Sequence, residues 1–309
     1  MLNRRDLLKL SGMAALGALL PSAGLASEKT ASGIFRFCLN TSTIRGQNPG
    51  LLASLEIAAK AGYDGVELWV SDVRDYIKSG NTIHTLAKFI SDRGLKVENA
   101  ISFTSWMAGD PAKRKEGMKQ LEEEMDIMSG LDCHYIAAPP AGVERGSAIN
   151  FQEAGRYYHE ILQLGRKYGV IPVLEFWGAS GTLYNLSQAL AIAAAADDPD
   201  AKILPDVYHL FRGGSGFNGL KLLSANAVEV IHFNDYPADK PVNEQTDSDR
   251  VYPGDGAAPL KQVLQYLLAM GGTKVLSLEL FNKTYWAQDP LTVAKTGLHK
   301  MKTLVATVL

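Results

Sequence analysis

The sequence predicts an α/β fold, a single (β/α)8 or TIM barrel that covers residues 27–309. Short apolar segments alternate strictly with longer amphipathic segments, which is the pattern of parallel strands joined by helices. Eight such strand segments are present, the number that closes a barrel of this kind. No linker or shift in composition divides the chain after residue 26, so one domain is expected.

The eight predicted strands are short and almost continuously apolar, as expected for strands that are covered on both faces. The first four are FRFCL (35–39), GVELWV (65–70), LKVENAIS (95–102) and HYIAAP (134–139). The last four are VIPVLEFW (170–177), KILPDVYHL (202–210), VEVIHF (228–233) and KVLSLELF (274–281). In such a barrel the C-terminal ends of all strands meet at one mouth, where the chemistry takes place.

The segments between the strands have apolar residues at helical spacing, and several end in the glycine that helices favour at their C-terminus. Clear examples, in chain order, are LLASLEIAAKAG (51–62), TIHTLAKFISDRG (82–94), GMKQLEEEMDIMSG (117–130), EILQLGRKYG (160–169) and LKQVLQYLLAMGG (260–272). Together with the strands they give the alternation that the barrel requires.

Residues 1–26 are expected to form an export signal of the twin-arginine type. The segment carries Arg4 and Arg5, continues with an apolar stretch at 10–20, and ends in small residues up to Ala26, after which we predict cleavage. The apolar stretch is too short to span a bilayer. The mature protein is therefore expected in the periplasm or otherwise outside the inner membrane.

The mature chain has 28 basic and 32 acidic residues and no visible basic patch, so nucleic acid is not an expected partner. No later apolar run is long enough to cross a membrane. The two cysteines, Cys38 and Cys133, lie in apolar segments far apart in sequence, and we predict two separate buried thiols. The expected partner is a small molecule, and the oligomeric state stays open, a homo-oligomer included.

Ionisable residues interrupt the ends of the last four predicted strands. A single histidine at such a position would more often be a satisfied core residue, but three carboxylates buried at one mouth are costly without a counter-charge. A divalent ion would supply that charge. Oxygen ligands with one nitrogen suit Mn²⁺, Mg²⁺, Co²⁺ or Zn²⁺ and do not distinguish among them. We predict one such ion, held by Glu175, Asp206, His232 and Glu279.

Other polar and aromatic residues near the strand ends have two interpretations each. Trp177 could offer its face to a sugar ring or pack at the rim, whereas for Trp69 and Trp106 we favour ordinary packing over lining the mouth. Glu67 could accept a hydrogen bond from a metal ligand or pair with a lysine, and the former is favoured slightly. Asp235 is expected to be a turn residue.

The motifs at these strand ends resemble those of the xylose-isomerase-like TIM barrel superfamily of sugar isomerases and epimerases. The similar segments are the Glu of VLEFWG (173–178), DVYH (206–209), IHFND (231–235) and LSLELF (276–281). Within the superfamily, DRVYPGDGAAPL (249–260) and LSLELFNKTYW (276–286) look most like the inosose isomerases. The resemblance extends from Phe35 onward. It implies that the four ionisable residues bind metal and that His209 and Arg250 contact substrate or the metal ligands.

The predicted function is isomerisation or epimerisation of a keto-sugar or keto-cyclitol. A divalent ion acts as a Lewis acid on a ketone and stabilises the enediolate that forms when a neighbouring carbon loses its proton. Glu175 and Glu279, the predicted catalytic residues, could each take and return that proton.

Two alternatives remain open. One is a lyase or dehydratase acting on a 3-keto-glycoside or a dehydroshikimate-like substrate at the same metal site, and an exported location favours a glycoside. The other is a non-catalytic exported carbohydrate-binding protein, although binding alone does not require two flanking glutamates. A nuclease is not expected: endonuclease IV resembles this chain near 249–256 but has a histidine where Val251 stands.

Overall fold

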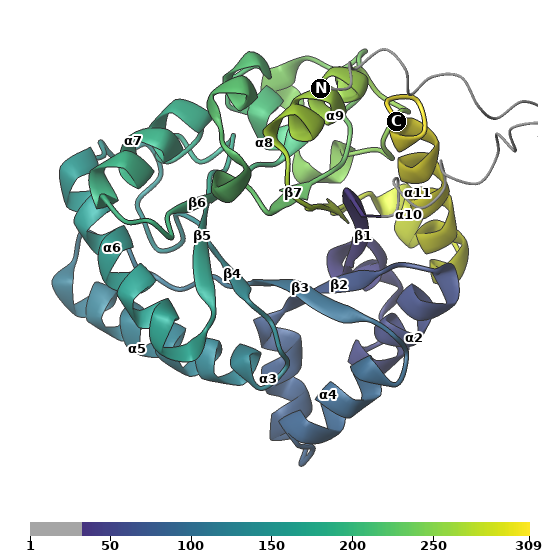
Figure 1. The fold of residues 1–309 in the computed structure, drawn as a ribbon, viewed down its shortest axis with the longest axis horizontal. Helices are drawn as coiled ribbons and strands as arrows, with labels where there is room; N and C mark the ends of the chain where they lie inside the picture. The colour runs from purple at the N-terminus through teal and green to yellow at the C-terminus, as the bar shows by residue number, and fades with distance from the viewer. Residues whose placement is uncertain (1–32) are drawn as a thin grey trace, which may run out of the picture.

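The computed structural model describes residues 33–309, and the predicted export signal at 1–26 lies outside this range. Eight parallel strands form a nearly closed barrel, in the neighbour order β6-β5-β4-β3-β2-β1-β8-β7. The strands lie around a ring with the helices outside it (Figure 1). The predicted (β/α)8 barrel is confirmed.

Each predicted strand segment contains one observed strand. These are β1 (Phe35–Asn40), β2 (Gly65–Trp69), β3 (Lys96–Ile101), β4 (Tyr135–Ala138), β5 (Ile171–Glu175), β6 (Lys202–Leu204), β7 (Val230–His232) and β8 (Lys274–Leu278). The sixth prediction, 202–210, is wrong beyond Leu204, because a short helix begins at Val207. The Asp206 side chain accepts a hydrogen bond from the backbone N–H of His209 (3.1 Å) and caps this helix.

The helices of the described residues are α2 (Leu51–Ala61), α3 (Val70–Lys78), α4 (Ile83–Ser91), α5 (Pro111–Ser129), α6 (Phe151–Tyr168), α7 (Leu186–Ala196), α8 (Val207–Arg212), α9 (Leu260–Met270), α10 (Lys283–Trp286) and α11 (Pro290–Val305). Gly62 and Gly169 end α2 and α6 with positive φ values of 93° and 69°, as the sequence pattern indicates. None of the helices within residues 33–309 is long and apolar enough to cross a membrane.

The barrel has a small apolar core of its own, separate from the larger core that packs around the sheet. Its members come from most of the strands: Cys38, Ile101, Ala137, Val173, Leu204, Val230 and Val275. Cys38 and Cys133 are both buried free thiols, as predicted.

The barrel closes between β6 and β7 through a single isolated bridge that pairs Asp206 with His232. The backbone N–H of His232 donates to the carbonyl of Pro205 at 3.0 Å. Two of the predicted metal ligands are therefore placed side by side by the closure of the barrel itself.

Candidate metal centre

The four predicted ligands meet at the C-terminal mouth of the barrel. Nδ1 of His232 lies 3.1 Å from Oε2 of Glu279, 3.3 Å from Oδ2 of Asp206 and 3.8 Å from Oε1 of Glu175. Single ligand atoms of Asp206, His232 and Glu279 all lie within 4.8 Å of one another. The four residues are at most 4% exposed. Three of the residues thus form a compact ligand set, and Glu175 lies next to it.

Glu67 fixes the orientation of the His232 ring. Its Oε1 lies 3.0 Å from Nε2 of His232, and it also accepts hydrogen bonds from the side chains of Asn40 (2.8 Å), Asn99 (2.6 Å) and Ser277 (2.6 Å). A carboxylate hydrogen-bonded to one ring nitrogen is typical of histidines that bind metal through the other ring nitrogen. These contacts agree with the favoured prediction that Glu67 accepts a hydrogen bond from a predicted metal ligand. The alternative, that Glu67 pairs with a lysine, is wrong.

Nδ1 of His232 therefore faces the three carboxylates. The atom is fully buried, and none of its contacts within residues 33–309 meets the geometry of a hydrogen bond. A buried polar atom without a partner is rare in proteins and calls for a group that would satisfy it. A divalent cation bound to Nδ1 and the surrounding carboxylate oxygens would do so, and the donor set fits the ion that the sequence predicts.

The charges of the cluster also favour a cation. Burial raises the pKa of Glu175 to about 8, with further repulsion from Glu279 and Asp206, while His232 opposes the rise. Burial would lower the pKa of His232, but Glu279 and Glu67 raise it well above its usual value. The carboxylates thus stabilise positive charge at His232, and a metal ion would supply this charge in place of a proton.

Arg250 links two carboxylates of the cluster to residues beside it. One guanidinium nitrogen donates to Asp206 Oδ2 (2.8 Å) and Glu279 Oε2 (2.7 Å), and the other donates to Asp247 (2.7 Å) and lies 3.2 Å from Nε2 of His209. Burial would raise the pKa of Asp206, but Arg250 and His209 hold it well below the usual range. Burial lowers the pKa of His209 and keeps it neutral near pH 7.

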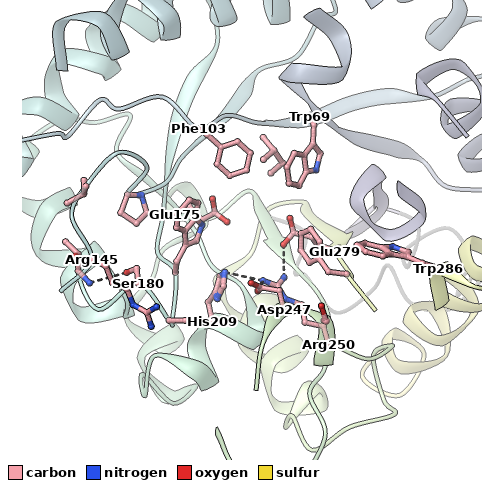
Figure 2. A pocket seen from close by; sticks show the side chains of 18 residues that line it. Trp69, Phe103, Arg145, Glu175, Ser180, His209, Asp247, Arg250, Glu279 and Trp286 are labelled. Carbon is pink, nitrogen blue, oxygen red and sulfur yellow. Dashed lines mark hydrogen bonds and ion pairs between the residues drawn. The ribbon is translucent and has the colours of Figure 1, made fainter. Parts of the chain in front are cut away.

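A cavity of about 620 Å³ opens above the cluster. The side chains of Glu175, His209, Arg250 and Glu279 face it (Figure 2). Trp177 also lines this cavity, so all three predicted substrate-binding residues, His209, Arg250 and Trp177, reach it. Their role in substrate binding stays a prediction.

Two tryptophans and Asp235 have different surroundings. Trp106 is fully buried and donates to the carbonyl of Pro139 (2.8 Å), as packing predicts. The same prediction is wrong for Trp69, which lines the cavity because its indole N–H donates to Asn40 (3.0 Å) and holds the ring at the mouth. Asp235 was expected to be a turn residue, but its backbone forms an isolated antiparallel bridge with Val251. Its side chain accepts hydrogen bonds from the backbone N–H groups of Tyr236, Gly254, Gly256 and Ala258.

Several residues that complete the site were not singled out from the sequence. Asn40 and Asn99 lie on β1 and β3, and Ser277 lies on β8, each as a buried polar residue in an apolar strand. That is the same signal that revealed the ligands, so they could have been found. Asp247 begins a short 3-10 helix in a polar segment and gives no such signal.

Replacing Glu67 by glutamine is expected to weaken metal binding about 10- to 100-fold, because the amide loses the negative charge that faces His232. Competition with a chelator measures the change. Glu98→Gln is the matched control, since Glu98 is also a buried glutamate, on neighbouring β3, but pairs with Arg36 (2.7 Å). Equal metal affinities in the two variants would contradict a role for Glu67 in metal binding.

The fold and the buried cluster at its mouth define a (β/α)8-barrel enzyme. The chain belongs to the xylose isomerase-like TIM barrel family, whose model matches residues 55–304.

Three comparisons place the chain within this family. It is 28% identical to the inosose isomerase of Halalkalibacterium halodurans over 84% of this chain and 94% of that protein. It is 25% identical to the 3-dehydroshikimate dehydratase of Pseudomonas aeruginosa over 80% of this chain, which is only 38% of that enzyme. A solved structure of the IolI protein with a binding zinc atom shares the fold, with a TM-score of 0.81, 24% identity and coverage of 89% of this chain and 99% of that one.

Proposed function

We propose that the protein is a divalent-metal-dependent isomerase or epimerase of a keto-sugar or keto-cyclitol. The observation that carries the proposal is the partnerless Nδ1 of buried His232, which faces three carboxylates beneath a cavity of about 620 Å³. Similarity to inosose isomerases over nearly the full length of those enzymes supports the same class of substrate.

His232, Asp206, Glu279 and Glu175 would hold the ion. When bound, it supplies Lewis-acid stabilisation of the negative charge that develops on a ketone oxygen. Arg250 and His209 line the cavity beside the ligands, where they can bind the oxygen atoms of a substrate and fix its position.

Glu175 and Glu279 would move the proton. Both carboxylates reach the cavity, from the ends of β5 and β8, and Figure 2 shows them separated by a gap within it. In the metal-free protein burial raises the pKa of Glu175 to about 8. A carboxylate that faces the cavity can accept a proton from a substrate carbon and return it. Return of the proton to the neighbouring carbon moves the carbonyl group. Return to the opposite face of the same carbon inverts the configuration of that carbon.

A dehydratase is the second candidate. Removal of a proton beside a carbonyl also prepares the loss of a β-hydroxyl group, so the same two glutamates could serve that reaction. The similarity to 3-dehydroshikimate dehydratases favours this candidate over a binding protein without activity. A 3-keto-glycoside would be a suitable substrate for such a lyase.

Turnover in D₂O tests the proton-transfer proposal. A proton held by a carboxylate exchanges with water, so NMR of inososes and keto-sugars incubated with the metal-loaded protein should show deuterium on the carbon next to the carbonyl. Each substrate incubated with the metal alone is the control. Product free of deuterium would reject proton transfer in favour of a hydride shift, and loss of a hydroxyl group would identify the dehydratase.

We also propose that the protein is exported by the twin-arginine route. Replacing Arg4 and Arg5 by lysine should retain it in the cytoplasm with residues 1–26 uncleaved, because the receptor of that route reads the arginine pair. Cell fractionation and the mass of the chain measure both effects. Export of the double variant at the normal level would contradict the proposal.

A further inference from the structure

Four aromatic side chains form a continuous arc along one wall of the cavity. In order they are Phe281, Trp69, Phe103 and Trp177, with successive ring centroids 6.2, 5.1 and 5.9 Å apart. They follow β8, β2, β3 and β5, so the barrel brings them together from distant parts of the sequence. Trp69 and Phe103 lie side by side, across the cavity from His209 and Arg250 (Figure 2).

The arc is exposed although it is apolar. Phe103 is 45% exposed, and the other three rings are partly exposed. The Arg45 guanidinium holds the ring of Trp69 in place, because it lies 3.7 Å from the ring centroid. Arg45 is itself fixed by an ion pair with Asp72 (2.7 Å). Exposed aromatic side chains gathered in a cavity mark a binding surface.

The cavity is also large for one sugar. Its volume of about 620 Å³ lies in the range of cavities that hold drug-sized ligands. A single hexose, with about 12 non-hydrogen atoms, would fill only part of a site in this size range. A substrate that filled the whole cavity would carry a second group beyond the sugar.

Three polar groups near the arc are already engaged within the protein. The indole N–H groups of Trp69 and Trp286 donate to Asn40 and to the carbonyl of Ser42, at 3.0 and 3.1 Å. The hydroxyl of Thr182 donates to the carbonyl of Glu144 (2.8 Å). A second sugar ring stacked on this wall would gain no hydrogen bond from these three groups, whereas a planar apolar ring needs none.

We propose that the aromatic arc binds an aromatic aglycone, so that the substrate is a keto-sugar joined to an aryl group through a glycosidic bond. The inference rests on the proposed function, which places the sugar on the ligand side of the cavity. The arc then stacks the aryl ring, and Phe103, the most exposed of the four, determines the preference for substrates that carry one.

Calorimetric titration of the mature, Mn²⁺-loaded protein with two unoxidised glucosides tests the arc without turnover. Phenyl β-D-glucoside is expected to bind at least about tenfold more tightly than methyl β-D-glucoside. Phe103→Ala should reduce this preference to about threefold or less and leave the affinity for the methyl glucoside unchanged. Phe151→Ala should keep the full preference, because Phe151 is 36% exposed at the start of α6, outside the cavity.

Three results would overturn the proposal: no measurable binding of the phenyl glucoside, an equal preference in Phe103→Ala and the unchanged protein, or cellobiose binding as tightly as the phenyl glucoside. The last would assign the arc to a second sugar. Because these glucosides do not react, failure of the deuterium experiment would reject the proposed function while leaving this binding result intact.

Discussion

Glu279→Gln is expected to lower turnover by a factor of about 10² to 10⁴ while the protein still binds metal. Glutamine keeps an oxygen for the ion and for Arg250, which donates to Oε2 of Glu279 at 2.7 Å, but it cannot accept a proton. Steady-state kinetics and elemental analysis of the same sample separate the two effects.

The matched control is Glu124→Gln. Glu124 is as buried as Glu279, but it lies on α5 and accepts a hydrogen bond from Ser102, away from the cavity. This variant should keep its turnover. Near-normal turnover of Glu279→Gln would show that Glu279 is only a ligand, and the mechanism with two glutamates would then be wrong.

Removing the metal is expected to abolish turnover and to lower the thermal midpoint. At a free ion concentration 100 times the dissociation constant, binding contributes about 2.7 kcal/mol to the free energy of unfolding. For a domain of this size that corresponds to a shift of about 5 to 10 °C. Elemental analysis should find about one ion per chain, in keeping with one compact ligand set. No bound metal and no thermal shift with Mn²⁺, Co²⁺, Zn²⁺ or Mg²⁺ would contradict the metal site.

The affinity of the protein for the metal ion should rise with pH. Burial raises the pKa of Glu175 from 4.5 to about 8, so binding near neutral pH must displace its proton. Below pH 8 the affinity should fall about tenfold per pH unit for each proton displaced. In the metal-free protein this group binds more protons folded than unfolded between pH 4.5 and 8, so its contribution to stability is lost as pH rises through that window. Titrations at pH 6 and 8 with equal affinities would contradict this linkage.

The barrel and the buried cluster of ionisable residues at its mouth were predictable because burial leaves a strong pattern in the sequence. Glu175 and Glu279 stand among apolar residues that continue past them, so a carboxylate there is conspicuous. The end of β6 was not predictable in the same way. The apolar run continues past Asp206 into Val207 and Tyr208, which belong to α8, so hydrophobicity alone could not separate strand from helix.

The surroundings of the ligands depend on contacts between distant residues. Glu67 meets a histidine 165 positions later in the chain, and no local pattern encodes that pairing. Trp69 was misjudged for a similar reason. A tryptophan at a strand end packs or lines a cavity according to what lies opposite, and here Phe103 and Phe281 stand beside it at the open mouth.

Because a single bridge joins β6 and β7, the residence time of a bound ion is expected to depend on how readily these two strands separate. Asp206 and His232 belong to the two strands that share one bridge in place of a ladder. An ion held by both would act as a cross-link at this seam, and parting of the strands would pull its ligands apart. Transient opening of the seam would therefore set the rate at which the ion escapes, even though every ligand is buried.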